Sequence, residues 1–398
     1  MAGIFSLPER LLARVGWAAN PETKASKAQA LVALHGQGQA RWTPRDYAAL
    51  TREGFMKNPI VYRCVRMISE ASSSVPLLAY EYDAELDSHP LLAVLKRPAR
   101  PAGGEDLLET LYGHLLVAGN AYLEAVLLND DLRELYALRP DRMKVVPGSS
   151  GWPEGYEYTA SGQKYRFQQT GEEFAPILHL TMFHPLDDHY GMAPLEAAQT
   201  ALDVHNETAN WNKALLDNSA RPSGALVYQN ADGGQLSQDQ FDRLKSELET
   251  SYQGRDNAGR PLLLEGGLDW KAMGLSPKEM DFAEAKNSAA RDIALAFGVP
   301  PMLLGIPGDN TYANYQEANR AFWRQTVLPL IARTLSALSH WTTPLYGEGF
   351  RLQYDADGVD ALSEEREAVW RRLEGASFLT DAEKRVALGY SPNTEDHL

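Results

Sequence analysis

GVPPMLLGIPGDNTYANYQEANRAFWRQTVLPLIARTLSAL, residues 298–338, is the most informative part of the chain. A helical pattern over about 277–297 comes directly before it. Gly298 predicts that this helix ends there, since glycine readily takes the left-handed conformation just beyond a helix end. Pro300 and Pro301 prevent continuation, because proline has no N–H and clashes with the preceding turn.

A polar loop and a second long helix follow. The loop covers 305–313, and the helix is predicted to begin near Asn314, whose side chain caps it while Glu317 reaches back. Pro329 lies inside this helix, and its missing N–H predicts a kink one turn upstream, near Gln325. No enzyme active site requires this order of elements.

Two long helical segments enclose a compact insertion upstream of this stretch. The first spans 194–218, and the second, 277–297, opens with a capping box and a proline at its first position. The insertion, 220–275, is predicted to contain a strand at 225–228, a helix opened by Ser237 and Gln240, and a strand at 261–265. The inserted helix carries a narrow apolar stripe of Phe241, Leu244, Leu248 and Tyr252. This order predicts a stalk formed by the two long helices, with the insertion as a small α/β unit at its tip.

The block at 43–190 is predicted to be an α+β domain with helices beside a mostly antiparallel sheet. Thr43-Pro44 and Asn58-Pro59 each place a capping side chain before a proline that suits the first helical position. Glu105 and Asp106 mark a third helix start, and Gly119-Asn120 is predicted to end this helix. Strands are predicted at 77–83, 121–128, 132–138, 143–146, 156–159, 164–167 and 177–180. A further strand at 350–354 and short helices after Ser363 and Thr380 complete the chain.

Composition limits the function. The 398 residues suffice for two or three domains, and 44% hydrophobic residues favour a folded protein. With 38 basic and 53 acidic residues the net charge is −15, which argues against tight nonspecific binding to nucleic acid, because no basic surplus displaces counterions. The single cysteine, Cys64, excludes an internal disulfide, and we interpret it as a small buried hydrophobe on a helix.

The N-terminal residues 1–42 are predicted to form an arm. They contain no secretory signal, since charged residues from Glu9 onward interrupt any apolar core. Leu7, Leu11, Leu12 and Val15 share one side of a short amphipathic helix that is better suited to a neighbouring protein than to a membrane. No segment of the chain is long and apolar enough to span a bilayer.

One histidine-rich turn is the only candidate for metal chemistry. His179, His184 and His189, with Asp187 and Asp188, lie where a strand runs into a Pro/Gly turn. Their spacing fits no common ligand pattern, so a metal-dependent hydrolase remains only an alternative hypothesis. The sequence has no Walker loop, zinc-protease motif or nucleophile elbow. We predict that the protein is not an enzyme and binds no cofactor or metal.

Five segments in order resemble the portal proteins of tailed bacteriophages. They are the 58–65 segment NPIVYRCV, His89-Pro90-Leu91, the 119–123 segment GNAYL, the 179–195 segment ending in YGMAPL, and Gly298-Val299-Pro300-Pro301. Each is weak alone, but together they cover about residues 43–390. One departure is Ala193, where the family usually has a capping serine. We expect Asp188 or water to cap the helix there instead, at a cost of about 1 kcal/mol.

The resemblance implies a portal-type architecture of named parts. The wing comprises 43–190 with 314–356, and the short crown and tail comprise 357–398. The stem helices correspond to 191–219 and 276–298, with the clip at 220–275 between them. The segment 299–313 contains the tunnel loop. In this family such subunits form a ring, usually of twelve, at one capsid vertex, so the expected location is the virion, after assembly in the cytoplasm of a bacterial host.

The resemblance also implies partners. Double-stranded DNA passes through the channel without sequence specificity, during packaging and ejection. The terminase motor, the head–tail adaptor and the major capsid protein attach to the ring, and no membrane is involved. The sequence leaves open whether the particle is an infectious phage, a prophage product or a gene transfer agent.

The acidic balance of the chain suits a channel in which DNA must slide, because strong phosphate contacts would slow the DNA. The expected DNA-facing loop residues are Gly305, Gly308, Asp309, Asn310, Thr311 and Tyr312, with Gly305 and Gly308 as pivots. Lys278, Lys286 and Arg291 are candidate stem contacts, although ion pairs within or between subunits explain them equally well. The stripe from Phe241 to Tyr252 is expected to pack between subunits. A structural adaptor without a channel is the second alternative, which a native mass would distinguish.

Overall fold

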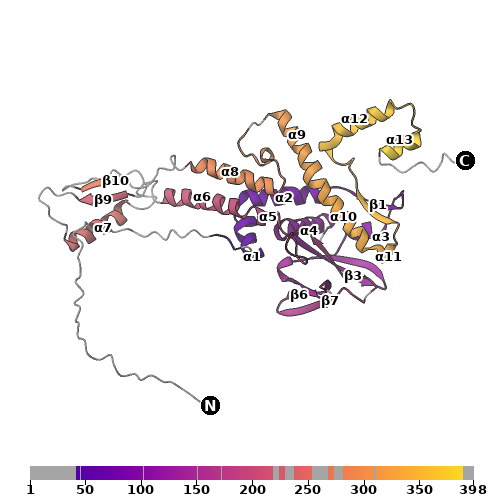
Figure 1. The fold of residues 1–398 in the computed structure, drawn as a ribbon, viewed down its shortest axis with the longest axis horizontal. Coiled ribbons are helices and arrows are strands. Elements are labelled where there is room, and N and C mark those ends of the chain that lie inside the picture. The colour runs from indigo at the N-terminus through magenta and orange to yellow at the C-terminus, as the bar shows by residue number, and fades with distance from the viewer. Residues whose placement is uncertain are drawn as a thin grey trace, which may run out of the picture. The chain divides into compact units, whose positions relative to one another are not determined.

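The structure, a computed structural model, describes residues 42–44, 46–101, 103–149, 151–171, 173–217, 224–228, 237–252, 268–272, 281–308 and 311–388. Helices pack beside small antiparallel sheets (Figure 1), which confirms the predicted α+β class. None of the described helices combines the length and the apolar character that crossing a bilayer requires.

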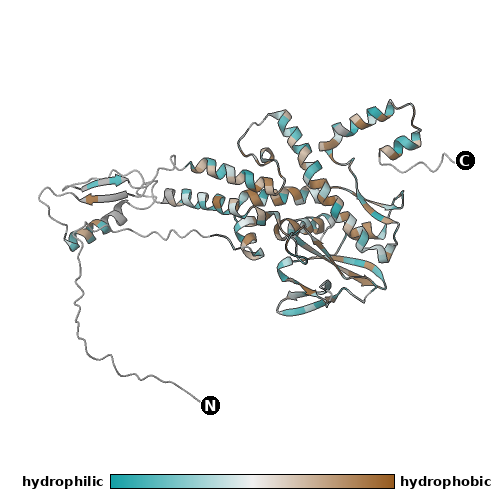
Figure 2. Cartoon of the chain, viewed as in Figure 1, coloured by the Kyte–Doolittle hydropathy of each residue, from teal (hydrophilic) through white to brown (hydrophobic). Residues whose placement is uncertain are grey.

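Three helices form the centre of the main core: α2 (Pro59–Ser73), α4 (Gly104–Ala118) and α10 (Leu328–Trp341). Their brown apolar sides are visible in Figure 2. The α2 cap is Asn58, as predicted, and its Oδ1 accepts hydrogen bonds from the first-turn amides of Ile60 and Val61. Buried members of the cluster include Cys64, Ile68, Leu111, Leu115, Ile331 and Leu335. Burial raises the pKa of the Cys64 thiol to about 12, so it is inert at neutral pH.

The first helical turns differ from the prediction. α1 (Tyr47–Leu50) continues into a π-helical turn, η1 (Thr51–Phe55), and its cap is Asp46, which accepts from the Ala49 amide at 2.9 Å. Thr43 does not cap this helix. Its backbone amide and hydroxyl donate instead to the buried carboxylate of Asp203, 160 positions away. The Thr43 hydroxyl therefore bonds to a residue far away in the sequence and does not cap the helix.

Three antiparallel sheets surround these helices. β1 (Leu77–Glu81) lies between β2 (Ala84–Leu86) and β11 (Phe350–Tyr354), which places the C-terminal strand beside the N-terminal block. β3 (Asn120–Leu128) lies between β4 (Asp131–Leu138) and β8 (Ile177–Thr181). The third sheet has the order β5 (Met143–Pro147), β6 (Pro153–Ala160) and β7 (Gln163–Gln168). The predicted strands are confirmed, with shifts of a few residues at their ends.

Short helices connect these elements. α3 (Pro90–Lys96) follows β2, the 3-10 turn η2 (Pro140–Arg142) precedes β5, and α11 (Thr343–Tyr346) precedes β11. α4 closes at Gly119, where φ is +69°, as the sequence predicted. The Asn129-Asp130 turn between β3 and β4 also has positive φ at both residues, which suits a tight hairpin.

The helix predicted at 194–218 is two helices. α5 (Pro194–Ala197) ends at Ala198, and α6 (Gln199–Asp217) continues the chain and packs against α8 (Phe282–Ala296). At the start of α5, Glu196 Oε1 accepts from the Ala193 amide at 3.0 Å. The glutamate supplies the half of a capping box that does not involve the serine hydroxyl, and the cap expected from Asp188 or water stays a prediction.

The insertion contains a two-stranded sheet and one helix within the described residues. β9 (Gly224–Tyr228) pairs with β10 (Leu268–Ala272), a strand that the sequence analysis missed. The strand predicted at 261–265 and the helix start at Ser276 lie outside the described residues. The capping box of α7 (Gln238–Tyr252) is confirmed, with Ser237 and Gln240 exchanging hydrogen bonds of 3.0 and 3.3 Å.

Candidate functional site

The end of α8 is fixed against a later helical turn. Gly298 has φ +67°, the left-handed conformation that ends α8. A β-carbon there would also lie 2.7 Å from Thr326 Oγ1. The Thr326 hydroxyl donates to the Gly298 carbonyl at 2.6 Å. Glycine is therefore required at 298 by both conformation and close approach.

The first half of the predicted loop is held on α8. After the 3-10 turn η4 (Pro301–Leu304), the buried side chain of Ile306 packs against Ala290 and Ala294 of α8. The Ile306 amide also donates to the carbonyl at the start of η4, at 3.2 Å. These contacts remove the freedom that the sequence suggested for Gly305, although its φ of +71° is again left-handed.

Arg291 adds a polar tie to the same segment. Its guanidinium, on α8, donates to the carbonyl of Pro307. A hydrogen bond from a charged donor is stronger than one between neutral groups. The chain is thus attached to α8 as far as Pro307.

The second helix begins earlier than predicted. α9 spans Tyr312–Phe322, and its cap is Thr311, whose hydroxyl accepts from the Asn314 amide at 3.3 Å. Asn314 is therefore inside the helix and is not its cap. Tyr312 is 79% exposed, whereas Ile306 is 5% exposed. The segment between them thus runs from a buried anchor to an exposed aromatic side chain.

The predicted irregularity at Gln325 is confirmed in position. The turn Trp323–Val327, η5, is π-helical and joins α9 to α10. Pro329 lies in the first turn of α10 and cannot donate to the Gln325 carbonyl. A π-turn accommodates this missing bond, and it also directs the Thr326 hydroxyl to Gly298.

The other predicted site residues are placed only in part. Lys286 is half-buried on α8, near the imidazole of His205. Phe241 and Leu244 are half-buried on α7. Asp309, Asn310 and Lys278, and the side chains of Leu248 and Tyr252, lie outside what the structure describes.

The histidine turn is a structural network. His179 Nε2 donates to Asn120 Oδ1 at 3.0 Å, its Nδ1 lies 3.3 Å from the Tyr156 hydroxyl, and its ring stacks on Tyr122 at 4.2 Å. Asn120 Oδ1 also accepts from the Gly191 amide at 2.8 Å. The described residues contain no group of three potential ligand side chains that could hold a metal ion. The metal-site alternative therefore has no support, because packing and neutral hydrogen bonds occupy His179.

The rest of this turn is shaped by local hydrogen bonds. His184 Nδ1 accepts from the Leu186 amide at 3.0 Å. Asp187 Oδ1 accepts from the amides of His189 and Tyr190, at 2.8 and 3.0 Å, and these bonds lower the pKa of the Asp187 carboxyl. These groups stabilise the turn in the conformation that brings Gly191 to Asn120.

We expect the His179 network to lose stability in mild acid. Burial lowers the pKa of His179 to about 4, and that of His114 on α4 similarly. An unfolded histidine titrates near 6.5, so between these values the unfolded chain binds more protons and stability falls as the pH falls. At pH 5 the loss is about 2 kcal/mol for His179 relative to pH 7.5.

Chemical denaturation at pH 7.5 and pH 5.0 measures this loss. His179→Gln should reduce the difference between the two pH values by about 2 kcal/mol. His184→Gln, which removes a half-buried histidine from the same turn, is the matched control for loss of an imidazole. Equal pH dependence in wild type and His179→Gln would contradict the assignment.

The order of these elements can now be compared with known proteins. The family model described as phage portal protein matches residues 59–389, which is most of the chain. The chain belongs to the phage portal protein family.

The chain is also similar to solved structures and to a curated protein. A chain in the neck of an empty gene transfer agent particle, computed with C6 symmetry, is 54% identical to this portal-family chain, with a TM-score of 0.70 over 89% of this chain and 96% of that one. A chain in the neck of a native particle, computed with C12 symmetry, is 53% identical, with a TM-score of 0.68 over 89% and 97%. A protein of Rickettsia bellii (strain RML369-C) is 42% identical over 85% of this chain and 88% of its own length.

Sequence reasoning missed two contacts of this portal-family chain. Arg291 was a candidate DNA contact with an ion pair as an equal alternative, and its hydrogen bond to the Pro307 carbonyl was not foreseen. Thr326 was not singled out at all, because its partner Gly298 is 28 positions away. Its place one turn before Pro329 was the only available signal, and this does not identify an acceptor.

Proposed function

We propose that this chain is the portal subunit of a phage-like particle of the gene transfer agent type. Membership of the phage portal protein family supports a portal role. The identity of 53–54% to chains in gene transfer agent necks supports that type of particle. In this proposal the subunit stands at one vertex of the virion capsid, as part of a closed ring. The C12 symmetry of the native neck supports a ring of twelve.

The segment around Gly308 is proposed to line the channel and touch DNA. Two observations support this proposal. The Ile306 side chain is buried, whereas the Tyr312 side chain, six residues later, is exposed. The helical segments on either side are joined by the hydrogen bond from Thr326 to the Gly298 carbonyl. Such a segment presents exposed residues on a fixed base. The proposed DNA-facing residues remain Gly305, Gly308, Asp309, Asn310, Thr311 and Tyr312. The net charge of −15 allows DNA to slide without strong attachment.

The remaining parts are assigned by the same proposal. α6 and α8 pack together as the stem, and the insertion with β9, α7 and β10 is the clip. The clip carries subunit contacts at Phe241 and Leu244, and it receives the terminase motor and the head–tail adaptor. The sheets around α2 and α4 form the wing, which meets the major capsid protein. ATP hydrolysis belongs to the motor, and the portal subunit acts as a structural conduit.

Native mass spectrometry of the purified full-length protein tests this proposal. We expect a closed species of about twelve times the 44.1 kDa of one chain. A species that stays monomeric at micromolar concentration, at several salt concentrations, would contradict the ring. It would instead favour a structural adaptor without a channel.

A further inference from the structure

The C-terminal helical hairpin lacks a core of its own. It consists of α12 (Ser363–Glu374) and α13 (Asp381–Ala387). The 3-10 turn before it, η6 (Asp360–Leu362), is anchored in the main core through Val359 and Leu362, which are 3% and 7% exposed. From Ser363 to Leu388, none of the side chains that the structure describes is buried.

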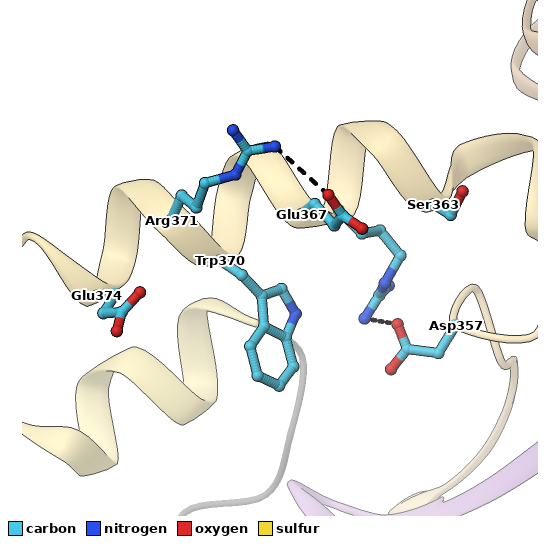
Figure 3. A pocket seen from close by; sticks show the side chains of 7 residues that line it. Asp357, Ser363, Glu367, Trp370, Arg371 and Glu374 are labelled. Atoms are coloured by element: carbon cyan, nitrogen blue, oxygen red, sulfur yellow. Dashed lines mark hydrogen bonds and ion pairs between the residues drawn. The ribbon is translucent and has the colours of Figure 1, made fainter.

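Large apolar side chains of the hairpin are exposed instead. Trp370 is 50% exposed, Phe378 is 85% exposed and Val386 is 56% exposed. Figure 3 shows Trp370 and Arg371 projecting from opposite sides of α12, with the indole beside an open groove. Exposed aromatic residues of this size are typical of protein–protein contacts, where they supply most of the binding energy.

Local interactions do not stabilise such a hairpin by themselves. Two helices of 12 and 7 residues are too short to be stable in water without packing. Its attachments to the rest of the chain include an exposed ion pair of 3.1 Å between Arg320 and Glu364, and the pair of Arg366 with Asp357. Exposed pairs of this kind contribute little. The capping box of Thr380 and Glu383 defines where α13 starts, but it does not bury apolar surface.

The charges of the hairpin are arranged asymmetrically. The first half of α12 holds Glu364, Glu365, Arg366 and Glu367, and its second half holds Arg371, Arg372 and Glu374, so the first half is net acidic and the second net basic. Glu367 and Arg371 also pair with each other across one turn, at 3.4 Å. α13 likewise has acidic residues first and basic residues last. The helix dipole favours this order within each helix. An acidic end and a basic end on the same surface also allow two identical copies to attract each other head to tail, which is the type of contact that closes rings.

We propose that the α12–α13 hairpin is an interaction surface for a second copy of this chain. The acidic end of one hairpin lies against the basic end of the next, and Phe378 and Trp370 become buried between them. This rests on the proposed ring and adds a specific contact to it. A second copy fits better than another partner because the surface supplies both charges of the contact, and because a chain 53% identical occurs in a neck with C12 symmetry.

The apolar part of the proposal is tested with Phe378→Asp, using Phe378→Leu as the matched control. Phe378 is so exposed in one subunit that neither change should alter its folding. The aspartate should raise the concentration needed for half-maximal ring assembly by about ten-fold or more, since burial of a Phe side chain is lost at every contact. The leucine variant should assemble close to wild type. Equal assembly of the two variants, in native mass spectra across a dilution series, would overturn the proposal.

The charged part is tested by mixing two variants of the full chain. One carries Arg371→Glu and Arg372→Glu, and the other carries Glu364→Lys and Glu367→Lys. Each alone should assemble poorly at low salt, because like charges then meet, whereas an equimolar mixture should form rings that alternate the two chains. Rings of each variant alone that match wild type would show that the hairpin ends do not meet.

Hydrogen exchange separates this proposal from the ring itself. In wild-type rings the amides of 363–388 should be protected, and in the Phe378→Asp subunit they should exchange rapidly. A wild-type ring in which this hairpin exchanges as fast as in the single subunit would leave the portal function intact and refute the contact. Absence of any wild-type ring would instead refute the proposed function.

Discussion

Deleting residues 308–310 is expected to give rings that assemble but particles that fail to package or retain DNA. The deletion keeps Ile306 in its buried site and keeps the Arg291 contact with Pro307. It also keeps Thr311, the cap of α9. The deletion removes only residues between the anchor and the helix, so the stem and the wing should be unaffected.

DNase-protected DNA, measured by quantitative PCR on purified particles, reports this loss. Native mass spectrometry of the same variant reports whether the ring persists. A control in which 308–310 are replaced by Gly-Ser-Gly keeps the length of the loop and should retain much of the packaging, since the proposed loop acts by fit rather than by charge. A deletion that abolishes the ring would place this segment at a subunit contact instead.

Gly191→Ala is expected to have the largest effect on folding stability. A β-carbon at 191 would lie 2.6 Å from the Met182 amide nitrogen, and closer still to the carbonyl oxygen of Gly119. Both neighbours are backbone atoms, which cannot rotate away as a side chain can. We expect a loss of about 3 kcal/mol or more, together with the loss of the hydrogen bond from Gly191 to Asn120.

Gly113→Ala is the matched control for this substitution. Gly113 lies inside α4, and a β-carbon there would meet nothing within 4 Å. Alanine is favoured over glycine in a helix by roughly 0.5–1 kcal/mol, so this variant should be slightly more stable than wild type. Urea denaturation of both variants gives the comparison. Similar stabilities for Gly191→Ala and wild type would mean that the Gly119–Gly191 contact is not formed.

The sequence predicted those parts of the fold that depend on neighbouring residues. The caps at Asn58, Ser237 and Thr380 and the helix ends at Gly119 and Gly298 are local signals, and all are confirmed. The strands at Leu77–Glu81 and Phe350–Tyr354 were both predicted, but their pairing was not, because it joins positions more than 260 residues apart.

The sequence-based predictions were wrong where two neighbouring residues could each cap the same helix, or where a residue far away in the sequence determined the contact. Thr311 and Asn314 are both good caps three residues apart, and their order in the chain does not show which one begins α9. Thr43 has a suitable cap sequence, yet Asp203 binds its hydroxyl. β10 was missed because Leu268–Ala272 is too short and mixed in polarity to stand out.

The candidate site was predictable as a segment but not as a set of contacts. The stop at Gly298, the polar stretch after Gly305 and the irregularity before Pro329 all follow from the chemistry of glycine and proline. Which residues hold the segment does not follow, since Arg291 reaches Pro307 and Thr326 reaches Gly298 only once the helices are packed.

Electron cryomicroscopy of the purified full-length protein would show directly whether the subunits enclose a channel. We expect a closed ring of about twelve subunits with an axial channel. The segment from Pro307 to Tyr312 should form the narrowest part of that channel, with the aromatic ring of Tyr312 directed inward. A ring in which this segment lies on the outer surface, or a protein that forms no ring, would contradict this expectation.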